Sequence, residues 1–367
     1  MKIAGFCQER SACTTLRTKH PLEKIRALGL AEVNIITDAS PNNVVSAIKA
    51  SDVVVLGRAS SQNILDMIVT MNQWGKKVVF DLDDNLFEVS VLSPHYKDFG
   101  TMAVDFEGED GSKSSVWKQG VNGFDAKVNR NRRAFFMDIV RVADCISVTT
   151  PPLEMAYRRF NDNVRILPNS IDFNIWGTPP LRWGKEEVRL LYTGATNHQE
   201  DWTFVAPVLA QLQKKYPQLK IVLVGPDWKY IDAGIDYSRV EHHGWIDFEA
   251  YPYLLKSLCC DIGIAPISKI TFNDSRSSLK WLEYSALSMA TVATQYGPYR
   301  RDVEDGRTGL LVRERDEWAQ ALSRLIEDKA YRKQLGMDAY AHCKRHYDLN
   351  YTVDLIVATY QRLLGVN

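Results

Sequence analysis

Residues 188–225, VRLLYTGATNHQEDWTFVAPVLAQLQKKYPQLKIVLVG, contain the structural unit from which this chain is built. Val188–Tyr192 and Lys220–Val224 are short apolar runs, and Trp202–Tyr216 between them repeats apolar side chains at helical spacing. Short strands that are apolar on both faces and alternate with helices are typical of a parallel sheet covered by helices. The stretch therefore predicts a strand, a crossover helix and a second strand parallel to the first.

The same alternation extends over most of the 367 residues. The other short apolar runs are Met1–Phe6, Val33–Ile36, Asp52–Leu56, Lys77–Phe80, Cys145–Val148 and Val164–Leu167, then Val240–His243, Asp261–Ala265, Thr291–Thr294 and Gly309–Val312. Helical patterns separate most of them, and the tail has three helical segments, Asp316–Ile326, Tyr331–His346 and Tyr351–Leu364, with no further strand. We therefore expect an α/β protein with two Rossmann-like, doubly wound domains and a C-terminal helical tail.

A chain of this length fits two domains. We place an N-terminal domain at 1–170, a C-terminal domain at 171–350, and a last helix at 351–367 that can pack back on the N-terminal domain. Pro179-Pro180 and Gly184 are reasonable linker residues between the two sheets. Ligands of such sheets bind beyond the carboxyl ends of the strands, so two domains that face each other define a cleft.

Composition excludes several classes of function. Lys plus Arg is 45 and Asp plus Glu is 45, so no global charge attracts nucleic acid or an acidic membrane. The N-terminus is unlike a signal peptide, no window approaches a membrane-spanning helix, and the six cysteines are scattered without metal-ligand spacing. We expect a soluble cytoplasmic protein with no metal site; the sequence leaves its oligomeric state open.

The densest group of polar residues lies at Asn273–Glu283. A helix is expected to begin at Ser277 or Ser278, because Ser is a favourable N-cap and apolar residues from Leu279 follow at helical spacing. Arg276 and Lys280 put cations at the positive end of this helix, which is unfavourable unless an anion such as a diphosphate binds there. Glu283, one turn later, can accept hydrogen bonds from vicinal hydroxyls. The alternative is an ordinary capped surface helix.

Two loops that directly follow predicted strands are further candidates. The loop Thr193–His198 includes Gly194, which permits close backbone approach, Thr196, and His198, which can donate to a phosphate or sugar oxygen. Gly225 ends the next strand along the chain. The alternative for His198 is an ordinary helix-opening residue beside an acidic first turn.

Three carboxylates, Asp81, Asp83 and Asp84, follow the run Lys77–Phe80. Alternation places Asp81 and Asp83 on one side and Asp84 on the other. They can bind a divalent metal, position a sugar hydroxyl, act as a base, or merely cap the next turn. Arg17 and Arg58 also follow N-terminal strands and are candidates for the same cleft.

Residues 91–128 interrupt the alternation with five glycines and no clear period, which predicts a long loop. Trp117 within it can stack on a sugar or base, or pack in the loop. Arginines 130, 132, 133 and 141 follow; they form either a solvated helix face or a docking site for a polyanion such as DNA.

Three strings resemble a known family: ILPNSID at 166–172, KWLEY at 280–284 and DGRTGLLV at 305–312. They are similar to the glycogen-synthase-like, family-four retaining glycosyltransferases of GT-B fold. The resemblance implies that a nucleotide-diphospho-sugar binds to the C-terminal domain and the acceptor to the N-terminal one. Glu283 matches the second Glu of the family's Glu-x(7)-Glu motif, which holds the ribose.

The sequence departs from the family at three positions. Ser275 replaces the first Glu of that motif, with Asp274 beside it, and the family's phosphate-binding Arg and Lys fall on Ala195 and about Glu200. The resemblance then implies that Arg276, Lys280, the helix N-terminus and His198 hold the diphosphate. The catalytic candidates are Asp84, Arg276, Lys280 and Glu283. The donor-binding candidates are Gly194, Thr196, His198, Gly225, Asp274, Ser277, Ser278, Leu279 and Glu283, and those on the acceptor side are Arg17, Arg58, Asp81, Asp83 and Trp117.

The expected function is transfer of a sugar, with retention, from a UDP- or GDP-sugar to a hydroxyl of a glycan or glycolipid, with no cofactor required. Glycosylation of modified DNA bases and a non-catalytic nucleotide-sugar-binding protein are the main alternatives, and a sugar-nucleotide epimerase is a third. A dehydrogenase is not expected, because no Gly-x-Gly-x-x-Gly follows the first strand.

Overall fold

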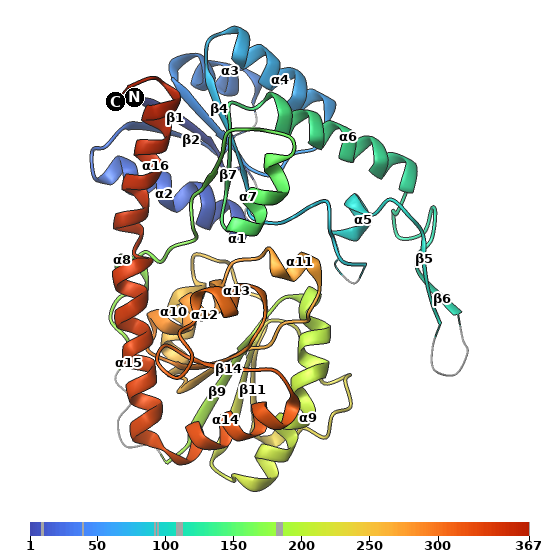
Figure 1. Ribbon diagram of the computed structural model, residues 1–367, viewed down its shortest axis with the longest axis vertical. Helices are drawn as coiled ribbons and strands as arrows, with labels where there is room; N and C mark the ends of the chain where they lie inside the picture. Colours follow the sequence, from blue (N-terminus) through green and yellow to red (C-terminus); the bar gives the residue numbers. More distant parts are fainter. Residues whose placement is uncertain are drawn as a thin grey trace. The chain divides into compact units, whose positions relative to one another are not determined.

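The computed structural model describes residues 1–8, 11–38, 40–91, 93, 95–107, 113–180 and 186–366. The chain divides into two compact units, which are treated separately below (Figure 1). Unit 1 comprises Met1–Pro168 and Val353–Asn367, and unit 2 comprises Asn169–Thr352. The predicted linker residues 181–185, Gly184 among them, lie outside the described residues.

Unit 1 is built on a six-stranded parallel sheet with the strand order β2-β1-β3-β4-β7-β8. The strands are β1 (Lys2–Phe6), β2 (Glu32–Ile36), β3 (Val53–Leu56), β4 (Lys77–Leu82), β7 (Cys145–Val148) and β8 (Val164–Ile166). The segments between them form α1 (Ala12–Thr14), the π-helical turn η1 (Thr15–Lys19), α2 (His20–Ala27), α3 (Pro41–Ala50), α4 (Gln62–Gln73), α6 (Ala126–Val142) and α7 (Pro151–Arg158). The inner strands β3 and β7 are buried along their whole length, which explains their uninterrupted apolar sequence.

Unit 2 repeats the plan with the strand order β11-β10-β9-β12-β13-β14. Its strands are β9 (Val188–Thr193), β10 (Leu219–Val224), β11 (Val240–His243), β12 (Ile262–Ala265), β13 (Ala290–Thr294) and β14 (Leu310–Val312). Its helices are α8 (Phe173–Trp176), η2 (Thr196–His198), α9 (Gln199–Lys215), η3 (Tyr237–Arg239), α10 (Tyr251–Leu258), α11 (Thr271–Asp274), α12 (Leu279–Ala286), α13 (Gly297–Asp302), α14 (Arg315–Glu327) and α15 (Lys329–His346). The last helix, α16 (Leu349–Leu363), begins in unit 2 and belongs to unit 1 from Val353 onward.

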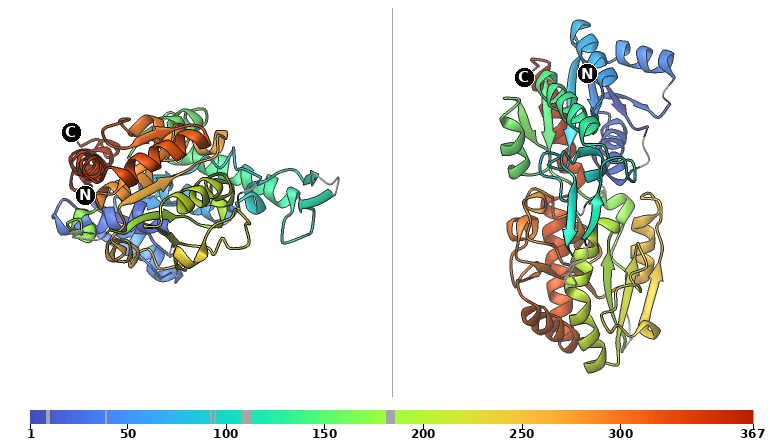
Figure 2. Two further views of the ribbon diagram at one scale, coloured as in Figure 1. Left: turned by 90° about the horizontal axis from the view of Figure 1, so that it is seen from below. Right: turned by 90° about the vertical axis from the view of Figure 1, so that its right-hand side faces the viewer.

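The α/β class, the two doubly wound sheets and the helical tail are as the alternation of apolar runs predicts. Every predicted strand is present, with ends within two residues of the expected ones. The long loop predicted at 91–128 is wrong in part, because it contains the short helix α5 (Tyr96–Phe99), an antiparallel hairpin of β5 (Val104–Glu107) and β6 (Lys113–Trp117), and the start of α6. The hairpin and the N-terminal end of α6 extend away from the sheet of unit 1 (Figures 1 and 2), while Phe136, Ile139 and Val140 of α6 pack in its core.

Strand order determines where each unit can bind a ligand. In unit 1 the chain moves outward from β1 in one direction to β2 and in the other to β3, so the order reverses between β1 and β3. In unit 2 the same reversal falls between β9 and β12. Crossovers leave opposite faces of the sheet at such a point and open a crevice beyond the carboxyl ends of the strands. The loops after β1 and β3 in unit 1, and after β9 and β12 in unit 2, are therefore the expected ligand-binding positions.

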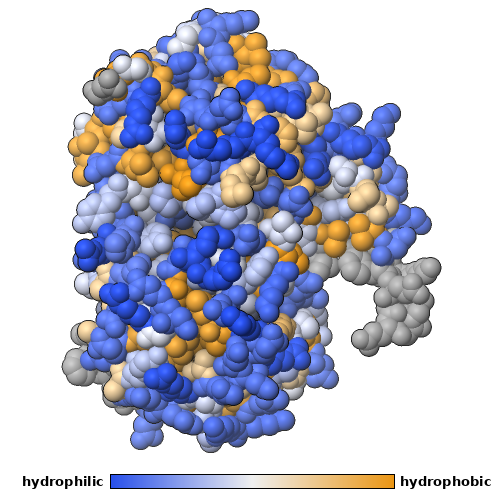
Figure 3. Space-filling model, in the orientation of Figure 1, coloured by the Kyte–Doolittle hydropathy of each residue, from blue (hydrophilic) through white to orange (hydrophobic). Residues whose placement is uncertain are grey.

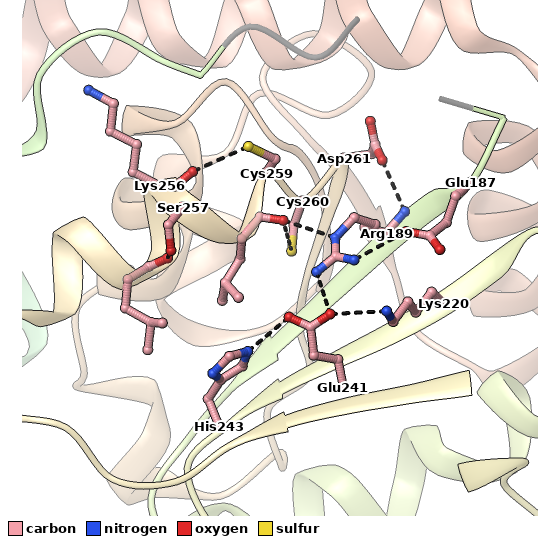
Figure 4. Close-up of polar contacts among 12 residues, drawn as sticks. Glu187, Arg189, Lys220, Glu241, His243, Lys256, Ser257, Cys259, Cys260 and Asp261 are labelled. Carbon is pink, nitrogen blue, oxygen red and sulfur yellow. Dashed lines mark hydrogen bonds and ion pairs between the residues drawn. The ribbon is translucent and has the colours of Figure 1, made fainter. Parts of the chain in front are cut away.

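An ion-pair network lies near the amino ends of strands β9, β10 and β11 in unit 2 (Figure 4). Arg189, near the start of β9, donates to Glu241 on β11 at 2.8 Å, to Glu187 at 3.1 Å and to the Leu258 carbonyl at 2.9 Å. Lys220 on β10 reaches the same Glu241 carboxylate at 3.1 Å. These partners satisfy one another and tie three strands to α10, so we assign the network to stability.

The surface is mixed. On the face drawn in Figure 3, hydrophilic residues predominate and apolar residues show in separate patches. Among the residues that the structure describes, none of the helices has both the length and the apolar character needed to cross a bilayer. All six cysteines are free thiols.

Candidate functional site

The N-terminus of α12 lies beyond the carboxyl end of β12, at the point where the strand order of unit 2 reverses. Ser278 is the N-cap residue, as the sequence predicts, but its side chain makes no capping hydrogen bond. Its hydroxyl instead donates to Asp302 Oδ2 at 2.6 Å. The neighbouring Ser277 Oγ accepts from Asn169 Nδ2 at 2.8 Å. The expectation that the Ser278 hydroxyl caps this helix is therefore wrong.

Lys280 is the second residue of α12, and its ammonium group is buried. Within the described part of the chain, Lys280 Nζ has no hydrogen-bond partner, and it lies 5.0 Å from the centroid of the Tyr192 ring. Burial lowers the pKa of this lysine to about 8, although the charge of Asp201 partly opposes the effect. A buried ammonium without a hydrogen-bond partner is costly, so its presence at a helix N-terminus favours a site for an anion.

His198, which ends η2, is held by Asp201 on the first turn of α9. His198 Nδ1 lies 2.7 Å from Asp201 Oδ2, and Asp201 Oδ1 accepts from the backbone N and the hydroxyl of Ser268 at 2.8 and 2.9 Å. Burial would raise the pKa of Asp201, but these hydrogen bonds and Lys280 keep it below its usual value. An ionised Asp201 can only accept a hydrogen bond, so the His198 proton lies on Nδ1 and the tautomer of the ring is fixed.

The same surroundings determine what His198 can offer a ligand. Burial, and then the nearby charge of Lys280, lower the pKa of His198 to about 3. The ring is therefore neutral near pH 7, and with its proton on Nδ1 the second nitrogen, Nε2, is an acceptor. In the free protein the ring can thus accept a hydrogen bond from a hydroxyl, and donation by His198 to a phosphate or sugar oxygen stays a prediction.

Glu283 follows Lys280 on α12 and is also buried. Its Oε2 accepts a hydrogen bond from the Tyr251 hydroxyl at 3.1 Å, and burial raises its pKa to about 7. The adjacent Tyr284 lies with its hydroxyl 3.0 Å from Thr193 Oγ1, at the end of β9. A buried carboxylate near its titration point suits the binding of vicinal hydroxyls.

Gly194 and Gly225 are in direct backbone contact at the ends of β9 and β10. Gly225 has φ +128°, and a Cβ at this position would lie 2.0 Å from the Gly194 carbonyl oxygen. A side chain at Gly225 would therefore displace the loop that carries His198.

We expect Gly225→Ala to lower the free energy of unfolding by about 2–3 kcal/mol, because alanine meets both the backbone strain and the Gly194 oxygen. Gly244→Ala is the matched control, since no atom lies within 4 Å of the place that its methyl group would take, and it should change stability by less than about 0.5 kcal/mol. Urea denaturation of both variants measures the difference. Equal stabilities would contradict the close contact.

The remaining donor-side candidates are Arg276, Leu279, Asp274 and Thr196, and their surroundings give less information about a ligand. Arg276 is half-buried with its guanidinium 5.8 Å from the Phe272 ring centroid, and Leu279 is the first residue of α12. Asp274 is approached by Arg301, which donates to its carbonyl at 2.7 Å. Thr196 is exposed in η2. Ser275 Oγ donates to the Phe272 carbonyl, so it does not replace a carboxylate.

In unit 1, the Arg17 guanidinium and the Asp81 carboxylate form a buried bidentate pair. Arg17 donates from Nε to Oδ1 at 3.0 Å and from NH2 to Oδ2 at 2.7 Å, and NH1 donates to the Leu167 carbonyl at 2.7 Å. Ser147 Oγ also donates to Asp81. The side chains of Arg17 and Asp81 are 8% and 7% exposed. Asp81 is thus occupied by partners that belong to the core of the unit.

Arg58, beyond the carboxyl end of β3, gathers the other two carboxylates. It donates to Asp84 Oδ2 at 2.7 Å and to Asp83 Oδ1 at 3.3 Å, and it lies 3.3 Å from His95 Nε2. The predicted alternation, with Asp81 beside Asp83, is wrong because β4 ends at Leu82 and the chain turns there. Among the described residues, no three His, Cys, Asp or Glu side chains are arranged as metal ligands.

Trp117 and the arginines of α6 are engaged within unit 1. Trp117 Nε1 donates to the Val91 carbonyl at 2.6 Å, and its ring lies against Tyr96 and Phe124. Arg130 donates to the Thr101 carbonyl, and Arg132 donates to the Asp98 carboxylate. Arg133 donates to the Phe87 carbonyl, and Arg141 donates to the Asp138 carboxylate. These contacts favour packing over the stacking and docking interpretations.

Each unit is a doubly wound α/β domain, and the chain matches solved structures of GT-B fold. The fold matches sucrose-phosphate synthase from Thermosynechococcus elongatus, with a TM-score of 0.66, 17% identity, and coverage of 100% of this chain and 99% of that one. It also matches HepE from Anabaena in complex with UDP and glucose, with a TM-score of 0.65, 16% identity, and coverage of 98% and 99%.

Residues 187–328 match the family model described as glycosyl transferases group 1. A D-inositol 3-phosphate glycosyltransferase of Arthrobacter sp. (strain FB24) is 26% identical over 204 residues, which cover 50% of this chain and 46% of that protein. A D-inositol 3-phosphate glycosyltransferase from Stackebrandtia nassauensis is 34% identical over 103 residues, which cover 28% of this chain and 22% of that protein. The chain thus spans half or less of these curated relatives. The predicted resemblance is confirmed over residues 187–328, which match a group 1 glycosyltransferase domain, and the fold of the chain matches that of GT-B proteins.

Proposed function

We propose that this chain transfers a sugar from a nucleotide-diphospho-sugar to a hydroxyl acceptor, with retention at the anomeric carbon. The observation that carries the proposal is the buried Lys280 ammonium without a described partner, beside the N-terminus of α12. A diphosphate supplies the negative charge that both features lack. Charge grows on the diphosphate as the bond to the anomeric carbon breaks, and donors fixed in advance stabilise it without reorganisation.

Unit 2 offers a group for each part of such a donor. Lys280 and the α12 amides face the diphosphate, Glu283 accepts from the ribose hydroxyls, and neutral His198 accepts a sugar hydroxyl through Nε2. UDP-glucose is the first donor to test, because HepE, a structural neighbour, was solved with UDP-glucose bound.

For the acceptor we propose a hydroxyl of a glycan or glycolipid that binds to unit 1. Asp83 and Asp84 share one guanidinium, that of Arg58, and Arg58 together with the other charges of the site lowers the pKa of Asp83. Carboxylates accept hydrogen bonds from hydroxyl groups and repel phosphates, so these two residues suit a hydroxyl acceptor. DNA as acceptor gains no support, since the α6 arginines already have partners within the unit.

The function is tested with a panel of UDP-, GDP-, ADP- and dTDP-sugars, read first as thermal stabilisation and then as nucleotide release with candidate acceptors. A donor at about 100 times its Kd adds about 2.7 kcal/mol of stability. Binding without release under any condition would favour a non-catalytic nucleotide-sugar-binding protein, an alternative that the serine at position 275 supports. Release of an altered donor without acceptor would indicate an epimerase.

We expect Glu283→Gln to weaken UDP-glucose binding about tenfold to a hundredfold, because the ribose hydroxyls lose a charged acceptor. The affinity of the unaltered protein should fall as the pH drops through about 7, where Glu283 gains a proton, and that of the variant should stay flat. Isothermal titration between pH 5.5 and 7, where Lys280 stays protonated, measures both. The exposed Glu186→Gln is the control, and equal pH profiles for all three proteins would remove Glu283 from the site.

A further inference from the structure

We propose that Asp201 is a positioning residue that supplies the negative charge opposite Lys280, while hydrogen bonds to other groups keep its carboxylate from occupying the ammonium. Lys280 then stays protonated, and its N–H groups stay available to the donor diphosphate. This inference rests on the proposed function and assigns a role to a residue that the family resemblance leaves without one. Asp201 is buried and acts on the ligand through Lys280.

Both carboxylate oxygens of Asp201 accept hydrogen bonds from groups other than Lys280. Oδ1 accepts from the backbone N and the hydroxyl of Ser268 at 2.8 and 2.9 Å, and Oδ2 lies 2.7 Å from His198 Nδ1. His198 belongs to the loop after β9 and Ser268 to the loop after β12. One carboxylate therefore joins the two loops that border the reversal of strand order in unit 2, and three hydrogen bonds fix its position.

The charge of Asp201 reaches Lys280 without a direct bond. A carboxylate that could move freely beside a buried ammonium would be expected to pair with it. Within the described part of the chain Lys280 Nζ has no hydrogen-bond partner, although Asp201 and Lys280 shift each other's pKa. The Tyr192 ring, 5.0 Å from Nζ, and the neutral His198 ring add no charge. A diphosphate can thus take the Lys280 donors without first breaking an ion pair.

The balance of charges around Lys280 makes Asp201 the important anion. Burial lowers the pKa of Lys280, Asp201 on α9 opposes this effect, Arg276 before α12 adds to it, and Glu283 on α12 opposes it; the result is a pKa of about 8. The pKa of Glu283 is itself about 7, whereas that of Asp201 lies below its usual value. Of these two carboxylates, Asp201 is therefore the one that is fully ionised at pH 7.

Three possible roles of Asp201 differ in how they depend on pH. A carboxylate that only repels the diphosphate would weaken binding at every pH, and one that only holds the two loops would change affinity by one factor throughout. In the proposed role, loss of the carboxylate leaves binding intact at low pH, where Lys280 is protonated without help. The loss then weakens binding as the pH rises toward 8.

The first test follows the titration of Lys280 in the ligand-free protein by NMR of isotopically labelled lysine side chains, with the signal assigned by Lys280→Met. Asp201→Asn keeps an oxygen that can accept from Ser268 and removes the charge. It should lower the Lys280 midpoint by about one pH unit. Asp316→Asn, in the first turn of α14 and exposed, is the matched control and should leave the midpoint unchanged.

The second test titrates both proteins with UDP-glucose at pH 6 and pH 8. The diphosphate of UDP-glucose is esterified at both ends, so its charge is the same at both pH values. Asp201→Asn should bind at least as tightly as the unaltered protein at pH 6, and its relative affinity should be about fivefold lower at pH 8. The titration of Glu283 cancels in this ratio, because Asp201 is not among the groups that shift the pKa of Glu283.

Ser268→Ala tests the second half of the proposal without removing a charge. Loss of the hydroxyl leaves Asp201 Oδ1 with one hydrogen bond fewer, so the carboxylate can turn toward Lys280. The Lys280 midpoint should then rise, and the affinity for UDP-glucose at pH 7 should fall about threefold, because the ammonium is occupied. This variant also keeps the proposal testable if Asp201→Asn does not fold.

An unchanged Lys280 midpoint in Asp201→Asn, an affinity ratio that is equal at pH 6 and pH 8, or a midpoint that fails to rise in Ser268→Ala would each overturn the positioning role. The proposed function is judged separately, by whether the unaltered protein binds UDP-glucose. If it does not bind while both midpoints move as described, the proposed function fails and Asp201 keeps its assigned effect on the charge of Lys280.

Discussion

Replacing Lys280 with methionine should lower turnover about 100- to 1000-fold, the usual cost of removing one fixed donor that stabilises developing charge. The same change should stabilise the free protein, because methionine fills a similar volume without burying an ammonium group. Nucleotide release from the donor identified by binding measures the first effect, and urea denaturation measures the second.

The direction of the stability change follows from the pKa of Lys280. Burial lowers this pKa from 10.5 to about 8, so the unfolded chain holds the proton more tightly than the folded one. The penalty is full below about pH 8 and disappears as the pH rises toward 10.5. At pH 7 the variant should therefore gain up to about 3 kcal/mol, with a smaller gain at pH 10.

Lys333→Met, at an exposed position of α15, is the matched control and should change neither quantity. A variant that keeps its turnover while gaining stability would show that Lys280 is buried without a catalytic role. A variant that loses both would show that the ammonium has a structural partner in the protein.

The largest loss of stability is expected from Asp81→Asn, at about 3–5 kcal/mol. The Arg17 guanidinium would stay buried, with its two bonds to the carboxylate weakened and its charge less well compensated. The matched control is Asp138→Asn, whose partner Arg141 lies 2.8 Å away with both side chains nearly half exposed, and which should cost less than about 1 kcal/mol.

The free energy of unfolding of both variants in urea decides the matter. Similar small losses would mean that the Arg17–Asp81 pair does not support unit 1, and Asp81 would return to the candidates for acceptor binding. Far-UV circular dichroism of the folded variants at low denaturant confirms that native sheets are being compared.

Much of the fold is determined locally, and the sequence shows it. Strands such as Val53–Leu56 are buried on both faces, so their apolar runs are uninterrupted and easily recognised. The hairpin Val104–Glu107 with Lys113–Trp117 lacks such a run, because it is only two-stranded and extends away from the core; the sequence therefore gives no signal for it. The helix start at Ser278 is local too, and its position was predictable from serine's capping preference.

What the tertiary structure alone decides is which partner each polar side chain finds. Ser278 turns from its helix to Asp302, 24 residues later, and Glu283 meets Tyr251, 32 residues earlier; no local pattern connects them. The same holds for Asp81, which pairs with Arg17 across 64 positions. Hydrogen-bonded partners need proximity in space, and parallel crossovers create it between segments far apart in the chain. The sequence thus determines the elements and the candidate groups, and the packing of the sheets decides which of those groups stay free for a ligand.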